Sequence, residues 1–272
     1  MLTSERRKAI AEIVKRESAV TTTALLQIFD VSTETIRKDL LYLEDKGLLS
    51  RVHGGAVSRN RVMPFRDFEK RLDEHRAEKR ELSVLAASLV SEGDIIGIDA
   101  GTTAIEFVDE LMRRFQELTI VTYSMDVFER VHDFKNFNII LCGGTYLNKE
   151  RAFYGSFTRK MLEGINLRKS FVFPSAISLK KGVCDYQPQI LELQTTLIEN
   201  SDLVIILADS SKWEKSALYR ICDVSDRYVF VTDSGLPDSI KQLYLENQCK
   251  ILTKAEDLQL EVRKQNTADH NR

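Results

Sequence analysis

The sequence has few of the residues that mark several large protein classes. Four prolines and four cysteines occur in 272 residues, of which 43% are hydrophobic and 29% are charged. This composition excludes collagen-like, disordered and disulfide-scaffold proteins and leaves room for one or two packed domains. No C-x-x-C pair joins the cysteines, which are Cys142, Cys184, Cys222 and Cys249. Free thiols in a reducing cytosol are therefore a better interpretation than a zinc ribbon or a redox pair.

Long apolar runs and metal-site spacings are also lacking. The longest run, Leu203–Ala208, is far shorter than the roughly 18 residues that a membrane helix needs. The charged segment Met1–Lys8 has no apolar stretch behind it, so it does not resemble a secretory signal. The four histidines are scattered along the chain, at His53, His75, His132 and His270. We therefore expect a cytoplasmic protein without a membrane segment, a metal or a cofactor.

Neither sign of charge dominates the whole chain. The 39 Lys and Arg and 41 Asp and Glu give a formal net charge of −2. Residues 1–60 carry ten basic and eight acidic side chains, and the remainder carries 29 and 33. Any basic surface is therefore expected near the N-terminus.

The first fifty residues show the apolar period of three short helices, over residues 6–16, 24–29 and 33–46. Thr22 or Thr23 is the expected cap of the second helix. Ser32 is a good N-cap for the third helix, and Gly47 ends it. A strand over residues 48–52 and a glycine turn follow.

This order of elements is typical of a winged helix-turn-helix, in which the third helix enters the major groove of DNA. Burial of Ile36, Leu40 and Leu43 leaves the opposite helix face for DNA. The DNA-contacting residues expected on the helix are Ser32, Thr33, Thr35, Arg37 and Lys38. Those expected in the wing are Arg51, His53, Gly54 and Gly55. Arg37 and Lys38 taken alone would also fit a solvated helix face.

From Arg76 onward, helical stretches alternate with short apolar runs, at residues 95–98, 118–123, 138–142, 170–173, 203–207 and 228–232. Such runs predict a mainly parallel α/β sheet that helices cover on both faces. The loops after parallel strands meet at one edge, where ligands bind. The ligand-binding residues expected there are Asp99, Gly101, Thr102, Thr103, Tyr123, Ser124, Gly143, Gly144 and Lys212.

Each of these loops has a chemical reason to bind an anion or a sugar. The Gly101-Thr102-Thr103 turn between a strand and a helix offers free N–H groups and hydroxyls for a phosphate. Lys212 would supply a cation, and Asp99 would bind sugar hydroxyls. The alternatives are a plain helix cap, a bare Gly143-Gly144 turn and a surface lysine.

The helix and wing motifs carry a resemblance to a known family. Residues 31–40 read VSTETIRKDL, and residues 51–56 read RVHGGA. This resembles the DeoR family of bacterial transcriptional regulators, whose pattern is V-S-x-x-T-I-R-R/K-D-L followed by R-x-H-G-G-A. The resemblance implies that Thr35, Arg37 and Lys38 lie in the DNA-reading helix, and that His53 to Gly55 form the wing.

The second part of the chain resembles the same family. Its motifs fall in the expected order, at Glu78-Lys79, Gly93-Asp94, Asp99 to Thr103, Gly143-Gly144, Gly155, Gly182 and Ala208 to Lys212. The resemblance implies a sensor domain similar in fold to ribose-5-phosphate isomerase, which binds phosphorylated sugars or related metabolites. We therefore divide the chain into a winged helix-turn-helix domain (1–57), a linker (58–75), a sugar-phosphate-sensing domain (76–260) and a polar tail (261–272).

Three positions depart from the family pattern. Tyr123 replaces the usual Asn, and the stretch from Arg168 to Phe173 lacks the Asp and Gly of D-x-A-F-x-G. The usual acidic pair after Gly182 is replaced around Gln189. All three are expected near the pocket edge, where they would change which ligand binds or whether one binds.

The expected function is a repressor of a carbohydrate-utilisation operon that binds double-stranded operator DNA under the control of a phosphorylated sugar. A homodimer or homotetramer is expected, because one head carries little excess charge. The alternatives are a sugar-phosphate isomerase-like enzyme and a constitutive DNA-binding protein with a non-functional pocket. The isomerases that the domain resembles carry an Asp-Gly-Ala-Asp-Glu run that is absent here, so catalysis is not expected.

Overall fold

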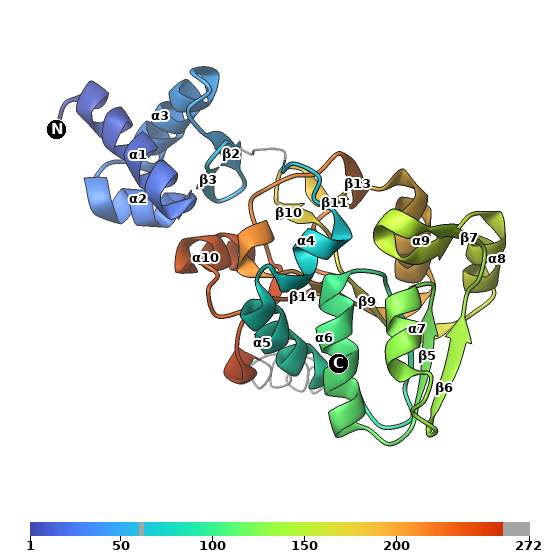
Figure 1. Cartoon of the computed structure of the whole chain (residues 1–272). Helices are drawn as coiled ribbons and strands as arrows, with labels where there is room; N and C mark the ends of the chain where they lie inside the picture. The colour runs from blue at the N-terminus through green and yellow to red at the C-terminus, as the bar shows by residue number, and fades with distance from the viewer. Residues whose placement is uncertain (60–62, 258–272) are drawn as a thin grey trace.

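The computed structural model describes residues 1–59 and 63–257. They form two lobes (Figure 1), a head (residues 1–59) and a body (residues 68–257), and the connector (residues 63–67) precedes the body. None of the helices in these described ranges has both the length and the apolar character that a membrane span requires.

The head is a three-helix unit with a small antiparallel sheet, as the sequence predicts. The helices are α1 (Thr3–Glu17), α2 (Thr22–Phe29) and α3 (Thr33–Asp45). The strands β1 (Ala19–Thr21), β2 (Ser50–Val52) and β3 (Gly55–Val57) are ordered β1-β3-β2. The hairpin of β2 and β3 is the wing. A strand as short as β1 gives no readable alternation in the sequence.

Side-chain caps set where two of these helices begin. Ser32 Oγ accepts the Thr35 N–H at 3.3 Å and begins α3, which confirms the predicted cap. The α2 cap is Thr21, whose hydroxyl accepts the Ala24 N–H at 3.1 Å. The expectation of a cap at one of the next two threonines is wrong, because both already belong to the first turn of α2.

A buried carboxylate fastens α1 to α3. Asp39 is 1% exposed, and its two oxygens accept from Arg6 Nε at 2.6 Å and from Arg7 Nε at 2.7 Å. A buried charge is tolerated only when it is paired and hydrogen-bonded, and here both oxygens have a cationic donor. The contact fixes the direction of α3 relative to α1.

The body is built on seven parallel strands in the order β15-β14-β12-β9-β4-β5-β6. These are β4 (Ile95–Ile98), β5 (Leu118–Thr122), β6 (Phe137–Leu141), β9 (Leu167–Val172), β12 (Ser201–Leu207), β14 (Tyr228–Val231) and β15 (Lys250–Leu252). Every neighbouring pair in this sheet is parallel. The prediction of a mainly parallel α/β domain is confirmed.

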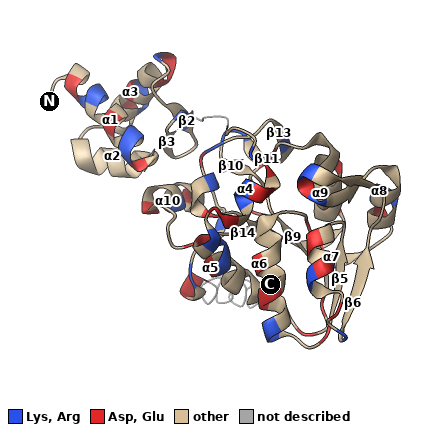
Figure 2. Ribbon diagram, viewed as in Figure 1, with Lys and Arg blue, Asp and Glu red and all other residues tan. Residues whose placement is uncertain are grey.

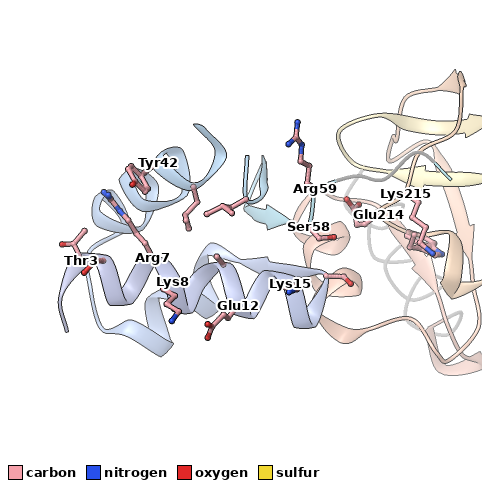
Figure 3. Close-up of a pocket in the computed structure, with 16 residues that line it drawn as sticks. Thr3, Arg7, Lys8, Glu12, Lys15, Tyr42, Ser58, Arg59, Glu214 and Lys215 are labelled. Atoms are coloured by element: carbon pink, nitrogen blue, oxygen red, sulfur yellow. The ribbon is translucent and has the colours of Figure 1, made fainter. Parts of the chain in front are cut away.

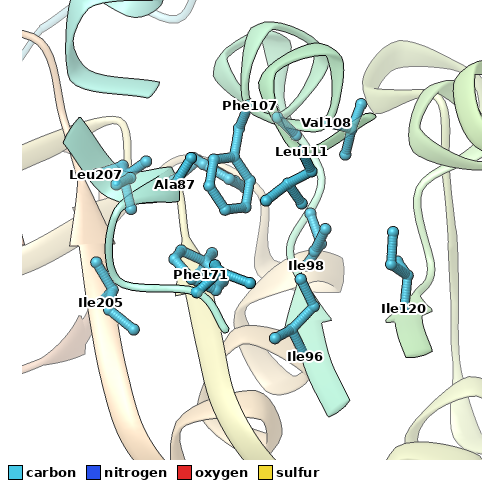
Figure 4. Packing of buried hydrophobic residues seen from close by; sticks show 14 of the residues in the cluster. Ala87, Ile96, Ile98, Phe107, Val108, Leu111, Ile120, Phe171, Ile205 and Leu207 are labelled. Atoms are coloured by element: carbon cyan, nitrogen blue, oxygen red, sulfur yellow. The ribbon is translucent and has the colours of Figure 1, made fainter. Parts of the chain in front are cut away.

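Helices cover both faces of this sheet. One layer holds α5 (Arg76–Ala87), α6 (Thr102–Arg114) and α7 (Met125–Val131), and the other holds α8 (Ser156–Glu163), α9 (Pro188–Glu199) and α10 (Asp238–Glu246). Successive residues of β12 alternate between the layers: Ile205 and Leu207 pack with Phe107 of α6 (Figure 4), whereas Ile206 packs with Leu243 of α10.

Short antiparallel strands add to this frame. One hairpin joins β7 (Thr145–Leu147) and β8 (Ala152–Tyr154), and a second sheet holds β10 (Ala176–Ser178), β11 (Gly182–Asp185) and β13 (Tyr219–Cys222). Two 3-10 turns, η1 (Asn148–Glu150) and η2 (Ser210–Lys212), complete the loops. Like β1, these pieces are too short for their period to be read in the sequence.

The stretch predicted as a linker, residues 58–75, is not wholly extended. It contains the helix α4 (Phe68–Asp73), whose Phe68 is buried. The prediction overlooked this helix because six residues with a single buried aromatic show no helical period. The predicted polar tail, residues 261–272, and residues 258–260 of the predicted sensing domain lie outside the described residues.

The head packs on the body through β1, the wing and α10. Ala19 and Val57 belong to the same buried cluster as Leu243 and Tyr244 of α10. At the wing turn, Asn247 Nδ2 donates to the His53 carbonyl at 2.9 Å. The head therefore has a defined position on the body.

We expect the Phe107→Ala substitution to lower the free energy of unfolding by about 3–5 kcal/mol relative to the parent. Phe107 is fully buried, and its ring lies 4.4 Å from that of Phe171. Urea denaturation followed by circular dichroism measures the change. Phe157→Ala is the control, because Phe157 is 78% exposed, and it should shift stability by about 0.5 kcal/mol or less. Equal effects of the two changes would contradict the core assignment.

Candidate functional site

The exposed face of α3 carries two cations near the start of the helix. Ile36, Leu40 and Leu43 are buried, whereas Arg37 and Lys38 are exposed on the other side. No hydrogen bond or ion pair among the described residues engages the Arg37 or Lys38 side chain. Both are thus available to base edges or phosphates.

Three polar side chains precede these cations on the same helix end. Thr33 is exposed, and Thr35 is half-buried. Ser32 Oγ both caps α3 and lies 2.9 Å from the Thr35 hydroxyl. Thr33 is therefore the freest of the three predicted hydroxyls. Lys and Arg are spread over both lobes rather than gathered on the head (Figure 2).

The wing turn contacts the body. His53 is exposed, but its carbonyl is bonded to Asn247, and a Cβ added to Gly54 would come within 2.9 Å of Glu246 Oε2. Gly55 is buried, and a Cβ there would meet the Val20 carbonyl at 2.2 Å. Gly55 is required by this backbone contact, whereas Gly54 is favoured by its positive φ of 81°. The approach of their backbone to DNA stays a prediction.

The remaining wing residue, Arg51, is half-buried, and its N–H donates to Glu44 Oε1 at 2.9 Å. Glu44 also pairs with Lys180 of the body at 3.2 Å. The hydrogen bond from the Arg51 N–H lowers the pKa of Glu44, and the Lys180 ammonium lowers it further. Arg51 therefore contributes its backbone to the link between α3, the wing and the body.

A broad crevice of about 1250 Å³ separates the head from part of the body (Figure 3). Exposed side chains of α1, among them Lys8, Glu12 and Lys15, form much of one wall, and Glu214 and Lys215 belong to the body. Arg7 lies over the Tyr42 ring at 3.9 Å. The crevice is open space between two packed lobes and gathers few buried polar groups.

A smaller cavity of about 120 Å³ lies at the carboxyl edge of the parallel sheet. Its walls include residues from several segments far apart in the sequence, namely Arg71, Lys79, Gly101, Thr102, Thr103, Glu150, Phe173, Ser175, Asp185, Asp209 and Lys212. The chain builds β4, β5 and β6 outward in one direction and then places β9 on the other side of β4. The cavity lies at this change of direction, where parallel sheets commonly bind ligands.

The N-terminus of α6 supplies one wall. Gly101 precedes the helix with φ 147°, a conformation that favours glycine. Thr102 and Thr103 begin the helix, and the first N–H groups of a helix have no carbonyl partner within it. These groups and the helix dipole favour an anion at this wall.

Two lysines face the same space. Lys79, on α5, is 3% exposed, and its ammonium donates to the Arg71 carbonyl. Burial and the nearby Lys212 lower the pKa of Lys79 to about 8. Lys212 Nζ donates to the Pro174 carbonyl at 2.9 Å and lies 3.9 Å from Asp209. Burial also lowers the pKa of Lys212, although Asp209 opposes this.

Arg71 and two carboxylates complete the polar wall. Arg71 pairs with Glu150 at 2.5 Å, while its buried Nε has no partner among the described residues. Asp185 accepts from Ser175 Oγ at 2.9 Å and from Gln194 Nε2 at 3.0 Å. The cavity thus combines cationic donors for an anion with carboxylates that accept bonds from hydroxyl groups.

Asp99 lies beneath this cavity rather than on its wall. It is fully buried and accepts from the Tyr123 hydroxyl, from the Phe173 N–H at 3.0 Å and from Gln194 Nε2 at 3.0 Å. Burial raises the pKa of Asp99 to about 6. Asp99 and Tyr123 therefore position Phe173 and Gln194, and the expectation that Asp99 itself meets sugar hydroxyls does not fit its burial.

The structure brings together only some of the predicted loops. Gly101, Thr102, Thr103 and Lys212 share the cavity. Ser124 instead caps α7 by accepting the Val127 N–H at 3.3 Å. The Gly143 carbonyl accepts from Thr158 Oγ1 at 3.0 Å, and Gly144 packs against the same threonine. These loops follow β5 and the edge strand β6, which lie away from the β4–β9 boundary.

The departures from the family pattern are scattered as well. Phe173 lines the cavity and Tyr123 supports it from below. Gln189 is exposed in the first turn of α9. Arg168 lies at the start of β9, 3.3 Å from Asp94. The expectation that Arg168 lies near the pocket edge is wrong, because the pocket is at the other end of that strand.

Sequence reasoning missed Arg71, Glu150 and the role of Lys79. Lys79 did give a signal: it lies on the buried face of α5 with Leu82, Ser83 and Ala86, where the helical period calls for an apolar residue. Arg71 and Glu150 come from α4 and η1, which are too short to be predicted. Among the described residues, no group of acidic, histidine and cysteine side chains could hold a metal ion.

Comparison with known proteins agrees with both lobes. Residues 6–62 match the model of the DeoR-like helix-turn-helix domain, and residues 74–234 match that of the DeoR C terminal sensor domain. The similarity to solved structures is weak: ribose 5 phosphate isomerase A from Neisseria gonorrhoeae covers 50% of this chain and 52% of its own, with 18% identity and a TM-score of 0.37. No activity follows from that likeness.

Full-length relatives are regulators. The uncharacterized HTH-type transcriptional regulator YulB of Bacillus subtilis is 36% identical over 89% of this chain and 94% of its own. The transcriptional repressor AccR of Agrobacterium fabrum is 33% identical over 86% and 90%, and the L-fucose operon activator of Haemophilus influenzae is 32% identical over 87% and 94%. The chain belongs to the DeoR family of DNA-binding transcriptional regulators.

Proposed function

We propose that this regulator is a cytoplasmic repressor of a carbohydrate-utilisation operon, and that a phosphorylated sugar bound in the body cavity modulates its hold on operator DNA. The observation that carries the proposal is the meeting of the α6 N-terminus with Lys79, Lys212 and Arg71 in one cavity. Buried cations are stable when an anion joins them. Relatives whose names mention a carbohydrate operon support the choice of a sugar, among them the L-fucose operon activator.

Within the cavity, the phosphate would meet the N–H groups of Thr102 and Thr103 together with the two lysines. Asp185 and Glu150 would accept hydrogen bonds from sugar hydroxyls. Gly143, Gly144 and Ser124 have no part in this proposed site, and Asp99 serves it only through Phe173 and Gln194. No cofactor is needed.

We also propose that the cavity senses its ligand without converting it. Asp185, a carboxylate of the cavity wall, is already held by Ser175 and Gln194, whereas isomerisation needs a base free to take a proton from the substrate. Incubation with D-ribose 5-phosphate should therefore yield no ribulose 5-phosphate. Product formation at enzymatic rates would contradict this part of the proposal.

On DNA, Arg37, Lys38 and Thr33 would contact the major groove. The ten basic and eight acidic residues of positions 1–60 leave an excess of only +2, so a single head should bind weakly. We therefore propose that a homodimer or homotetramer binds repeated half-sites.

Arg37→Ala should weaken binding to the DNA upstream of the chain's own gene by about 1–3 kcal/mol, that is, about five- to 150-fold. Fluorescence anisotropy at fixed salt measures the affinity. Arg159→Ala is the matched control, because Arg159 is an exposed arginine on α8 of the body. Equal affinities of parent and Arg37→Ala would remove α3 from the DNA interface.

Lys212→Ala should abolish stabilisation by sugar phosphates and leave DNA binding without ligand unchanged. A thermal-shift panel of D-ribose 5-phosphate, D-glucose 6-phosphate, D-fructose 6-phosphate and D-fructose 1-phosphate provides the readout. A ligand at 100 times its Kd stabilises the folded state by about 2.7 kcal/mol. Lys160→Ala, on the exposed side of α8, is the control. A normal ligand response in Lys212→Ala would rule out this cavity.

Affinity for the sugar phosphate should fall as the pH rises through 8. The pKa of Lys79 is about 8, and an anion beside it favours the protonated amine, so above that pH binding must take up a proton. The expected loss is at most about tenfold per pH unit. Calorimetric titration from pH 7 to 9.5 measures it. The arginine of Lys79→Arg stays charged over this pH range, so the affinity of this variant should vary little with pH. If its affinity still falls with pH, a group other than Lys79 causes the pH dependence.

A further inference from the structure

The connector forms part of the cavity wall. Met63, Pro64, Phe65 and Arg66 line the same space as Thr102, Thr103 and Lys212. Pro64, Phe65 and Arg66 are exposed on their other side. This segment is therefore a wall one chain thick between the cavity and solvent.

The body holds the connector by a small number of contacts. The Met63 N–H donates to the Ser216 carbonyl at 2.9 Å, and the Tyr186 hydroxyl donates to the Met63 carbonyl. The Phe65 ring meets the Tyr186 ring edge-on at 5.9 Å. Arg66 pairs with Glu74 at 2.8 Å, an exposed pair that contributes little. Tyr186 is thus the main link between the connector and the body.

Tyr186 also adjoins the polar wall of the cavity. Its N–H donates to Asp185 Oδ1 at 2.6 Å, and Asp185 is bonded to Ser175 and Gln194. A hydroxyl that binds Asp185 must compete with these bonds. Tyr186 therefore contacts both Asp185 and the connector residue Met63.

The connector is also tied to the head by a short length of chain. The last residue of β3 is Val57, and the six peptide units from there to Met63 span at most about 20 Å. On the other side, the wing turn is held to α10 by the bond between Asn247 and His53. The position of Met63 therefore limits where the head can lie on the body, and a change in that position changes this limit.

We infer that residues 63–66 belong to the ligand site, and that an anionic sugar bound there acts on the head by changing how Tyr186 holds Met63. This inference rests on the proposed function and adds the route of regulation. A ligand shifts the head only if it binds the two connector arrangements with different affinity. Direct contact between ligand and connector supplies such a difference.

Phe65→Trp tests the contact. The native Trp213 is 3% exposed and does not line this cavity, so the new indole reports on the connector. Titration with inorganic phosphate and with D-ribose 5-phosphate should change its emission with the same midpoint as the thermal shift. Phe157→Trp on α8 is the control and should not respond. A thermal shift with unchanged Phe65→Trp emission would overturn the connector inference and leave the proposed function intact.

Tyr186→Phe tests the coupling, because it removes the bond to Met63 and keeps the ring beside Phe65. In the parent, a saturating sugar phosphate, taken as the panel member with the largest thermal shift, should change DNA affinity about tenfold or more. In Tyr186→Phe the change should fall below about threefold at saturating ligand, while the thermal shift still reports ligand binding and the ligand-free DNA affinity is nearly retained. Tyr146→Phe, an exposed tyrosine of β7, is the matched control.

The outcomes separate the two claims. Full coupling in Tyr186→Phe would overturn the connector route, even though the ligand still binds. Absence of any thermal shift with phosphate or with the sugar panel would contradict the proposed function and this inference together. Equal loss of coupling in Tyr146→Phe would show a general effect of tyrosine replacement and would also overturn the route through Tyr186.

Discussion

Buried positive charge at the carboxyl edge of the sheet is the constraint on which the body depends. Lys79 is 3% exposed, the Lys212 side chain is 20% exposed, and Asp209 is the carboxylate that lies nearest to Lys212. Charged groups in such places are costly unless they are paired. Short contacts to backbone carbonyls satisfy donors of the two ammonium groups without neutralising them. A bound anion would neutralise the positive charge of these ammonium groups, which is why we regard the cavity as a binding site.

The position of this cavity explains how one domain can affect another. The connector, which precedes the body and follows the head in the sequence, forms part of its wall. The head contacts the end of α10 through the wing turn. Regulation then needs no long pathway across the sheet. It needs two arrangements of the connector that differ in their affinity for the ligand and in where they place the head on the body. Gly55 packs closely between the Val20 carbonyl of the head and Leu243 of α10, which makes that position specific.

The sequence predicted the frame well and the site in part. Periodicity located α1, α3 and the central strands, because each has enough buried apolar positions to show its spacing. It also pointed to the turn at Gly101 and to Lys212. It did not reveal that β9 inserts beside β4, since strand order depends on packing between distant segments. Ser124 and Gly143 do not line the cavity, whereas Arg71 of α4 and Glu150 of η1 do.

In the regulation that we propose, ligand and DNA compete through the connector, and linkage makes this competition directly measurable. If the sugar phosphate weakens DNA binding by a given factor, operator DNA must weaken sugar-phosphate binding by the same factor. Calorimetric titration of the sugar phosphate into the free regulator and into its saturated DNA complex measures both affinities. We expect the sugar phosphate to bind the DNA complex with an affinity about tenfold lower than it binds the free regulator, in line with ordinary coupling free energies. Equal affinities in the two titrations would contradict it.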